Sequence, residues 1–315
     1  MPENKNNLRV IFMGTPHFSA EILSALLDHK YGICAVFTQP DKKVGRKQIL
    51  EKSPVKILAE KNNIPVFTPH RLDQEAIAKA KNLNPDLIIL VAYGKILSQA
   101  FLDLPSRGAV NIHPSLLPKF RGPSPIQNAL LEDEKITGTT IMLMDAGMDT
   151  GDILKQETVE ISPNETYFEL EEKLIQLSSR LLMEVLLELI DQKIVPQKQE
   201  GEKATYCKMI AKNDGQIDWH DPAEMIYNKY RAFAKWPGIF TFCNSKRLKL
   251  NKISPTSIET SAHQPGEIFE YTDGVCVQAG RGAIKIEEVQ LESKPNMKIS
   301  DFVNGQKKFI GSILD

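Results

Sequence analysis

The chain has 315 residues, of which 42% are hydrophobic and 25% are charged, and its formal net charge is −1. This length is sufficient for a full hydrophobic core and favours two domains over one. A balanced charge provides no overall field that would draw the chain to nucleic acid or to a membrane surface. No apolar run reaches the roughly 20 residues of a membrane helix, and the first residues resemble neither a signal nor a transit peptide. We therefore expect a cytoplasmic protein without a membrane partner.

The four cysteines, at positions 34, 207, 243 and 276, are far apart and lack metal-ligand spacing. Such cysteines are typical of reduced thiols in a cytosolic protein. The sequence therefore predicts no metal site and no disulfide framework.

The chain opens with a strand–turn–helix–strand pattern. An apolar β-branched run over 8–13 ends at Gly14, where Thr15 is expected to cap a helix with Pro16 at its first position. A second strand is predicted over 33–38. This βαβ unit indicates an α/β fold with a mostly parallel sheet. Because the first turn has only one glycine, the GxGxxG fingerprint is absent, and we reject a nicotinamide cofactor.

A basic segment over 41–48 separates the second strand from a helix that is expected to open at Ser53 and Pro54. One interpretation is a solvated surface loop, as most charged runs are. The other is a phosphate contact in which Gly45 is a hinge and Arg46 provides a forked donor. The residues alone do not decide between the two.

The run over 86–91 is continuously apolar, as expected of a central strand that is buried on both faces. It ends at Tyr93 and Gly94. Ligands of open α/β sheets bind beyond the carboxyl ends of such strands, so these residues and Gly14 should gather on one edge. Tyr93 is about as consistent with a capping aromatic residue as with the lining of a pocket.

The stretch over 108–122 carries the strongest candidates for chemistry. Asn111 and His113 are two residues apart on a predicted strand, so their side chains leave by the same face. An amide donor beside an imidazole could stabilise a developing oxyanion. Asp145 and Asp149 follow in a glycine-interrupted loop. Taken singly, these residues are more often a surface histidine before a proline turn and ordinary turn-forming aspartates.

The remaining chain divides into a helix and a second domain. Ser162 and Glu165 form a capping-box pattern that predicts the start of a long helix with an apolar stripe. The polar run over 191–207 is typical of a linker. Beyond it, short apolar runs alternate with turn residues, which favours a small β-rich barrel. We therefore predict domains over 1–190 and 208–315, joined by the linker 191–207.

Two motifs together carry a family resemblance. Asn111-Ile-His113-Pro-Ser-Leu-Leu-Pro118, with Asp145-Ala-Gly-Met-Asp149-Thr-Gly151 downstream, resembles the formyltransferases that use 10-formyltetrahydrofolate. The resemblance implies a Rossmann-like formyltransferase domain over about 8–190 and a smaller OB-like domain after it. It also implies a catalytic set of Asn111, His113 and Asp149.

Further motifs are similar to the branch of this family that formylates initiator methionyl-tRNA, and they cover nearly the whole chain. They are Gly14–Phe18, Thr38–Asp41, Phe120–Gln127, Ala204–Lys212, Ile217–Trp219, Arg231–Gly238 and Asp301–Gly305. The chain departs from the usual pattern of this branch at two places. The basic segment has few basic residues after Arg46, and position 207 is a cysteine where a small residue is common.

The resemblance implies an enzyme that passes the formyl group of 10-formyltetrahydrofolate to the α-amino group of methionine on initiator tRNA, without a metal. It would bind the folate with Gly14, Tyr93, Gly94, Ser115, Leu116, Leu117 and Pro118. It would bind tRNA phosphates with Arg46, Lys47, Lys208 and Lys212. We expect a monomer, since no coiled coil or swapped arm is evident.

Three alternatives remain open at this point. The chain could formylate a small amine such as an amino sugar nucleotide, which would not require a tRNA-binding second domain. It could hydrolyse formyltetrahydrofolate, although such hydrolases usually differ at the amino-terminal end. It could also be a non-catalytic RNA-binding protein, against which the complete Asn111, His113 and Asp149 set argues.

Overall fold

The computed structural model describes residues 8–45, 48–256, 258, 262–272, 274–306 and 308–315. It divides into two compact units. The first comprises Met1–Pro125, Ile136–Ile161 and Glu171–Lys208, and the second comprises Ile126–Lys135, Ser162–Leu170 and Met209–Asp315. The domains 1–190 and 208–315 and the linker 191–207, which the sequence suggests, remain predictions. The structure adds that the segment 191–207 groups with the first unit.

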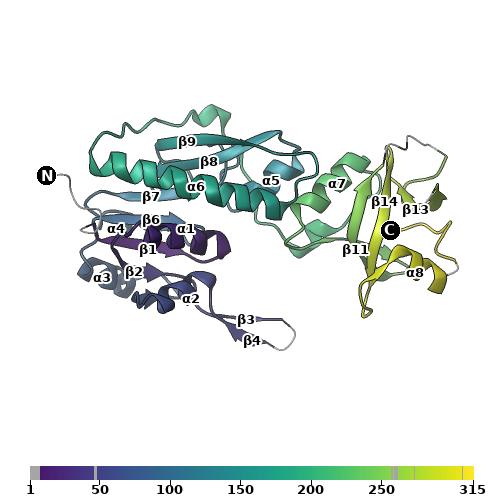
Figure 1. Cartoon of the computed structure of the whole chain (residues 1–315), viewed down its shortest axis with the longest axis horizontal. Helices are drawn as coiled ribbons and strands as arrows, with labels where there is room; N and C mark the ends of the chain where they lie inside the picture. The colour runs from purple at the N-terminus through teal and green to yellow at the C-terminus, as the bar shows by residue number, and fades with distance from the viewer. Residues whose placement is uncertain (1–7, 46–47, 257, 259–261, 273, 307) are drawn as a thin grey trace. The chain divides into compact units, whose positions relative to one another are not determined.

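A seven-stranded sheet is the centre of the first unit (Figure 1), with the order β5-β2-β1-β6-β7-β8-β9. Its strands are β1 (Val10–Gly14), β2 (Ile33–Phe37), β5 (Val66–Phe67), β6 (Leu87–Val91), β7 (Ala109–His113), β8 (Ile136–Leu143) and β9 (Ile153–Glu160). The pairs from β5 to β7 are parallel, whereas β8 and β9 are antiparallel to their neighbours. The predicted α/β fold with a mostly parallel sheet is confirmed.

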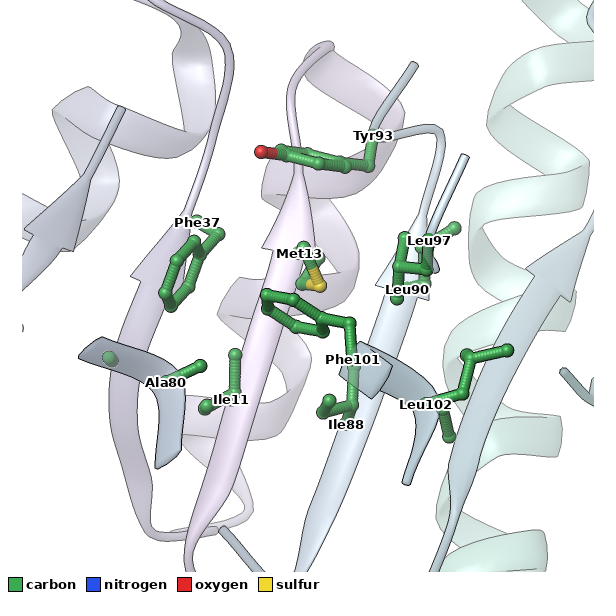
Figure 2. Packing of buried hydrophobic residues seen from close by; sticks show 12 residues of the cluster. Ile11, Met13, Phe37, Ala80, Ile88, Leu90, Tyr93, Leu97, Phe101 and Leu102 are labelled. Carbon is green, nitrogen blue, oxygen red and sulfur yellow. The ribbon is translucent and has the colours of Figure 1, made fainter. Parts of the chain in front are cut away.

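Helices cover both faces of the parallel strands. The helices of the chain up to β9 are α1 (His17–Asp28), α2 (Pro54–Lys61), α3 (Gln74–Asn82), α4 (Gln99–Leu102) and α5 (Pro125–Leu131). Helix α1 contacts β1 and β6, and α2 contacts β2. On the opposite face, alternate strand residues such as Ile11, Met13 and Ile88 pack with Phe101 of α4 (Figure 2). Burial on both faces explains why β6 is apolar at every position.

Two of the predicted helix starts have different outcomes. Ser53 caps α2 as predicted, because its hydroxyl accepts a hydrogen bond from the Lys56 amide at 3.0 Å, with Pro54 in the first turn. The predicted cap of α1 is wrong. Pro16 is the N-cap residue, and the Thr15 hydroxyl instead donates to the Tyr93 carbonyl at 3.2 Å. A tertiary partner therefore takes the hydroxyl that the local pattern assigns to the helix.

The long helix α6 (Tyr167–Ile190) begins later than the capping-box pattern predicts. Glu165 does accept a hydrogen bond from the Ser162 amide at 2.7 Å, but this bond closes a turn. The same pattern recurs four residues on, where Glu169 accepts from the amide and the hydroxyl of Thr166 at 2.6 Å each. The capping-box pattern that lies at the start of α6 is therefore the second one, formed by Thr166 and Glu169.

The basic segment after β2 forms a short hairpin of β3 (Lys42–Val44) and β4 (Ile49–Glu51). Gly45 turns the chain with φ +70°, as expected of a residue without a Cβ. At the base of the hairpin, the Lys56 ammonium lies 2.8 Å from the largely buried Asp41 carboxylate. Arg46 and Lys47, the predicted tRNA contacts of this segment, lie outside the described residues.

The second unit is built on an antiparallel sheet with the order β10-β11-β14-β13-β12, and β15 pairs with β14. Its strands and helices are β10 (Ile239–Cys243), β11 (Lys246–Pro255), β12 (Ile268–Tyr271), β13 (Gly274–Gln278), β14 (Ala283–Leu291), β15 (Met297–Lys298), α7 (Ala223–Ala232) and α8 (Ile299–Gly305). The predicted small β-rich domain is confirmed.

Residues 312–315 connect the two edges of this sheet. Phe242 of β10 and Asp315 exchange backbone hydrogen bonds of 3.2 and 3.0 Å. On the other edge, the Leu314 amide donates to the Gly266 carbonyl at 2.9 Å, and Ile313 bridges Glu267 just before β12. A connection between both edge strands is what closes a sheet into a barrel, and it leaves fewer unpaired edge groups.

Arg231 of α7 is the largest fully buried side chain among the described residues, with 2% of its surface exposed. Its guanidinium donates to the Asp133 carboxylate at 3.1 Å, to the Asn228 side chain and to the Glu165 carbonyl at 3.4 Å. All four residues belong to the second unit. A buried charge with several partners is costly to disrupt.

We expect Arg231→Ala to lower the free energy of unfolding by about 3 kcal/mol, near the low end for a broken buried ion pair because Asp133 is half exposed. Arg281→Ala is the matched control. Its pair with Glu224 is exposed and should contribute less than about 1 kcal/mol. Chemical denaturation of both variants measures the difference. Equal effects would show that burial of Arg231 is not what stabilises this unit.

Candidate active site

The carboxyl ends of the parallel strands meet as predicted, through hydrogen bonds between their loops. The Tyr93 carbonyl, after β6, accepts from the Thr15 hydroxyl after β1 at 3.2 Å and from the Gln39 amide after β2 at 3.0 Å. The Gln39 backbone amide also donates to the Thr15 hydroxyl at 3.4 Å. Three strand ends are therefore joined at one edge, where α/β folds bind ligands.

Strand β7 places Asn111 and His113 on one face. It pairs with β6 on one side and with β8 on the other, so both residues lie inside the sheet. Asn111 is 6% exposed and His113 is 5% exposed. The interpretation of His113 as a surface histidine is therefore wrong. A buried amide and imidazole must find polar partners, because an unsatisfied buried polar group is costly.

Asp149 is the partner that the two side chains share. Its carboxylate accepts a hydrogen bond from the Asn111 amide at 3.4 Å, and its other oxygen lies 3.8 Å from Nδ1 of His113. That second oxygen also accepts from the Gly122 backbone amide at 2.8 Å. The three predicted catalytic side chains are thus brought together although 38 residues separate Asn111 from Asp149.

The two aspartates of the loop after β8 have different environments. Asp145 accepts hydrogen bonds from the Gly147 amide at 3.0 Å and from the Thr150 hydroxyl at 2.7 Å. It is a turn-forming residue, as the alternative interpretation holds. Asp149 instead has a left-handed backbone with φ 54°, which is uncommon for a residue other than glycine, and it faces β7.

The other ring nitrogen of His113 contacts a backbone carbonyl. Nε2 lies 2.9 Å from the Phe120 carbonyl oxygen. Because a carbonyl only accepts, Nε2 must carry a hydrogen in this arrangement. Nδ1 is then the nitrogen that faces Asp149, and it is the atom through which His113 can act on a substrate.

Within the predicted folate segment 115–118, alternate residues have different roles. Ser115 is fully buried, and its hydroxyl donates to the Lys119 carbonyl at 2.7 Å. The Leu117 amide donates to the Thr140 hydroxyl at 3.1 Å. The Thr140 hydroxyl also donates to the Ser115 carbonyl at 2.7 Å, so these two backbone contacts hold the loop on β8. Leu116 and Pro118 are partly exposed, so they are the members of the segment with surface for a ligand.

The remaining predicted folate residues lie at strand ends. Gly14 is buried at the end of β1, and Gly94 is exposed after β6. The Tyr93 side chain belongs to the hydrophobic cluster of the sheet and is 0% exposed (Figure 2). Burial raises the pKa of Tyr93 to about 12. Its hydroxyl has no hydrogen-bond partner among the described residues.

Of the predicted tRNA contacts, Lys208 and Lys212 are described and are exposed. Lys208 belongs to the first unit and Lys212 to the second. Exposed ammonium groups are available to phosphates, but the same is true of many surface lysines.

The sequence did not point to a polar network behind Asp149. Arg121 is 5% exposed, and two of its nitrogens donate to the Gln199 side-chain oxygen at 3.2 and 2.7 Å. Gln199 in turn donates to the carbonyls of Asp149 and Gly151 at 2.9 and 2.7 Å. Arg121 lies in one of the motifs that carry the resemblance. Gln199 lies in the predicted linker, where nothing in the residue pattern signals a buried contact.

Cys207 lies against the same loop. Its amide donates to the Arg121 carbonyl at 2.8 Å, and its thiol accepts from the Ser124 amide at 3.4 Å. Burial raises the pKa of the Cys207 thiol, so it is neutral at physiological pH. A neutral, buried thiol is a poor nucleophile, which favours a packing role for this residue.

Among the described residues, no cluster of three or more His, Cys, Asp or Glu side chains could hold a metal ion. In the same part of the chain, no helix is both long enough and apolar enough to cross a membrane.

Comparison with protein families defines the class. The family model described as "Formyl transferase" matches residues 7–186, and the one described as "Formyl transferase, C-terminal domain" matches residues 209–307. The parallel sheet therefore belongs to a formyltransferase domain.

Curated relatives define the branch. The chain is 45% identical to the methionyl-tRNA formyltransferase of Caldicellulosiruptor saccharolyticus over 97% of this chain and 99% of that one. It is 41% identical to that of Geobacter metallireducens, over 95% and 96% of the two chains. The chain belongs to the methionyl-tRNA formyltransferase family. The predicted family and the predicted formyltransferase activity are confirmed.

Solved structures show the same fold at low identity. HypX from Aquifex aeolicus in complex with tetrahydrofolic acid superposes with a TM-score of 0.66 at 16% identity, over 96% of this chain and 48% of that one. An N-formyltransferase from Helicobacter canadensis, in complex with folinic acid and dTDP-3-aminofucose, superposes with a TM-score of 0.67 at 20% identity. The match covers 89% of this chain and 98% of that one. These likenesses confirm the fold class.

We expect Tyr93→Phe to leave the KM for 10-formyltetrahydrofolate unchanged and to retain or raise stability, by up to about 1 kcal/mol, because it removes only an unpaired buried hydroxyl. Tyr93→Ala is the contrasting variant. It should destabilise the protein by about 3–5 kcal/mol by leaving a cavity in the cluster. Steady-state kinetics and chemical denaturation measure both. A KM that rises tenfold in Tyr93→Phe would show that the hydroxyl itself binds the folate.

Proposed function

We propose that this chain transfers the formyl group of 10-formyltetrahydrofolate to the α-amino group of the methionine on initiator methionyl-tRNA, which gives formylmethionyl-tRNA for translation initiation. The observation that carries the proposal is that Asn111 and His113 both face Asp149, with their side-chain nitrogens 3.4 and 3.8 Å from its carboxylate oxygens. It occurs in a chain of the methionyl-tRNA formyltransferase family.

The reaction needs a stabilised oxyanion. The neutral amine attacks the formyl carbon on N10 of the folate, and the carbonyl oxygen becomes negatively charged in the tetrahedral intermediate. The Asn111 amide donates one hydrogen bond to this oxygen, and a protonated Nδ1 of His113 donates a second, charge-assisted one. Both groups are nearly buried, so these donors act in a poorly solvated place where such bonds are strong.

The attacking amine must also lose a proton. Asp149 accepts it through a water, and the same proton is returned to N10 as the bond between the formyl carbon and N10 breaks. Its side chain is 18% exposed, so a substrate amine or a water can reach the carboxylate. The same carboxylate faces Nδ1 of His113 at 3.8 Å and helps to orient the imidazole.

The folate is bound, in this proposal, at the carboxyl edge of the sheet. The exposed Gly94 contributes to the wall, the buried Gly14 and Tyr93 support it, and the loop 115–118 covers the site. Support comes from the joined loops after β1, β2 and β6 and from the partly exposed Leu116 and Pro118. Ser115 and Leu117 maintain the shape of that loop.

The tRNA is held through its phosphates by Arg46, Lys47, Lys208 and Lys212. Support for the last two is their exposure. Phosphate contacts orient the nucleic acid without reading its sequence.

We further propose that the protein is a cytoplasmic monomer. Light scattering of the purified protein tests the monomer, and a mass of twice 35.4 kDa would reject it.

The decisive assay combines the purified protein with 10-formyltetrahydrofolate and methionine-charged initiator tRNA, beside an uncharged tRNA and a control without tRNA. We expect N-formylmethionine only with the charged initiator. Folate that is consumed without tRNA would indicate a hydrolase or a small-amine transferase instead. No reaction in any of the three mixtures would reject the proposed substrate.

We expect His113→Ala and Asn111→Ala each to lower kcat by about 10²–10³-fold, because each removes one donor to the oxyanion. Binding of charged tRNA should be retained, since neither side chain is exposed enough to contact a phosphate. Rapid-quench kinetics measures the first effect and a filter-binding titration the second. Turnover near that of the unaltered protein would remove the residue from the catalytic set.

The affinity for tRNA should fall as the salt concentration rises, because binding to phosphates releases counterions. We expect Lys208→Ala to reduce the slope of log K against log salt by about 1. Lys193→Ala is the matched control, since Lys193 is an exposed lysine of the same unit that pairs with Asp191 at 2.8 Å. Equal slopes for the two variants would exclude a phosphate contact at Lys208.

A further inference from the structure

Asp149 is held at its backbone as well as at its carboxylate. Its left-handed φ of 54° is a conformation that residues with a side chain rarely adopt without support. The Gly122 amide holds the carboxylate at 2.8 Å, and the Gln199 side-chain amide holds the Asp149 carbonyl at 2.9 Å. The orientation of Asp149 toward β7 thus depends on groups outside the catalytic set.

The chemistry of the contacts determines how the Gln199 amide is oriented. Its oxygen accepts from two nitrogens of Arg121, which is a donor only, and its nitrogen donates to the carbonyls of Asp149 and Gly151. A flipped amide would place donor against donor and acceptor against acceptor at every one of these contacts. Arg121 therefore orients Gln199, and Gln199 orients the loop.

Arg121 is itself fixed. Its third contact is the Tyr206 hydroxyl at 3.2 Å, and backbone hydrogen bonds join residue 121 to the carbonyl of Thr205 and the amide of Cys207 at 2.9 and 2.8 Å. The chain can approach so closely because of Gly122, where a Cβ would lie 2.5 Å from the Cys207 carbonyl oxygen. All of these residues belong to the first unit.

We infer that Arg121 and Gln199 are positioning residues for formyl transfer: Arg121 orients the Gln199 amide, which holds the Asp149 loop so that the carboxylate faces Asn111 and His113. The inference rests on the proposed function. It also makes the segment 197–207 a structural part of the active site, although its composition is that of a linker.

Gln199→Ala should lower kcat by about 10²-fold, because a small displacement of a catalytic group has effects of that size. The KM values for folate and charged tRNA should change little, since the lost contacts do not face either substrate. Gln197→Ala is the matched control. Gln197 is exposed and pairs with Ile153 through its backbone, which the substitution leaves in place, so its kcat should equal that of the unaltered protein.

Gln199→Glu separates the two contacts of the side chain. A glutamate keeps an acceptor for Arg121, and therefore the fold of the segment, but it replaces the donor to Asp149 and Gly151 with a repelling oxygen. We expect its kcat to fall as far as that of Gln199→Ala, with a cooperative unfolding transition that shows the variant is folded. Full activity of Gln199→Glu would overturn the inference, even if Gln199→Ala does not fold.

A background without the catalytic carboxylate tests whether Gln199 acts through Asp149. In Asp149→Ala, adding Gln199→Ala should cause no further loss of single-turnover rate, because both changes remove the same function. An additional loss of about 10²-fold would show that Gln199 acts by another route and would refute the inference. Formylation by the unaltered protein tests the proposed function separately, so the two failures are distinguishable.

Discussion

The candidate site depends on the return of the loop that follows β8. Because β8 is antiparallel to β7, its last residue, Leu143, pairs with Val110 near the start of β7. The chain therefore leaves β8 at the end of the sheet opposite His113, and Asp149 approaches β7 only because the loop folds back. Gly151 allows this return, since a Cβ there would lie 1.8 Å from the Leu143 carbonyl oxygen.

This constraint explains the polar groups around the loop. A loop that folds back over a sheet turns backbone carbonyls away from strand partners, and buried carbonyls need donors. Gln199 provides those donors, while the Gly122 amide fixes the carboxylate. His113 is restrained in the same way through the Phe120 carbonyl. The catalytic candidates are thus preorganised by backbone contacts, which favours stabilisation of a developing charge.

Local patterns predicted the parts of the site that depend on one strand. Two-residue periodicity places Asn111 and His113 on one face, and the parallel βαβ pattern places Tyr93 at the carboxyl edge. Local patterns failed where a tertiary partner competes for the same side chain. Thr15 binds the loop after β6 instead of capping α1, and Ser162 with Glu165 closes a turn before α6 begins. In each case the residue type was correct for a cap, and a longer-range or later partner decided its use.

The sequence by itself determined the α/β class, the mostly parallel sheet, the family and the candidate trio, because periodicity and motif spacing are local properties. Only the tertiary structure decided that Asp149 faces β7 while Asp145 forms a turn, and that Gln199 holds the loop rather than lying in a free linker. The physical reason is that a hydrogen bond between residues 50 positions apart, such as that from Gln199 to Asp149, depends on how the chain packs. No spacing along the sequence encodes that contact.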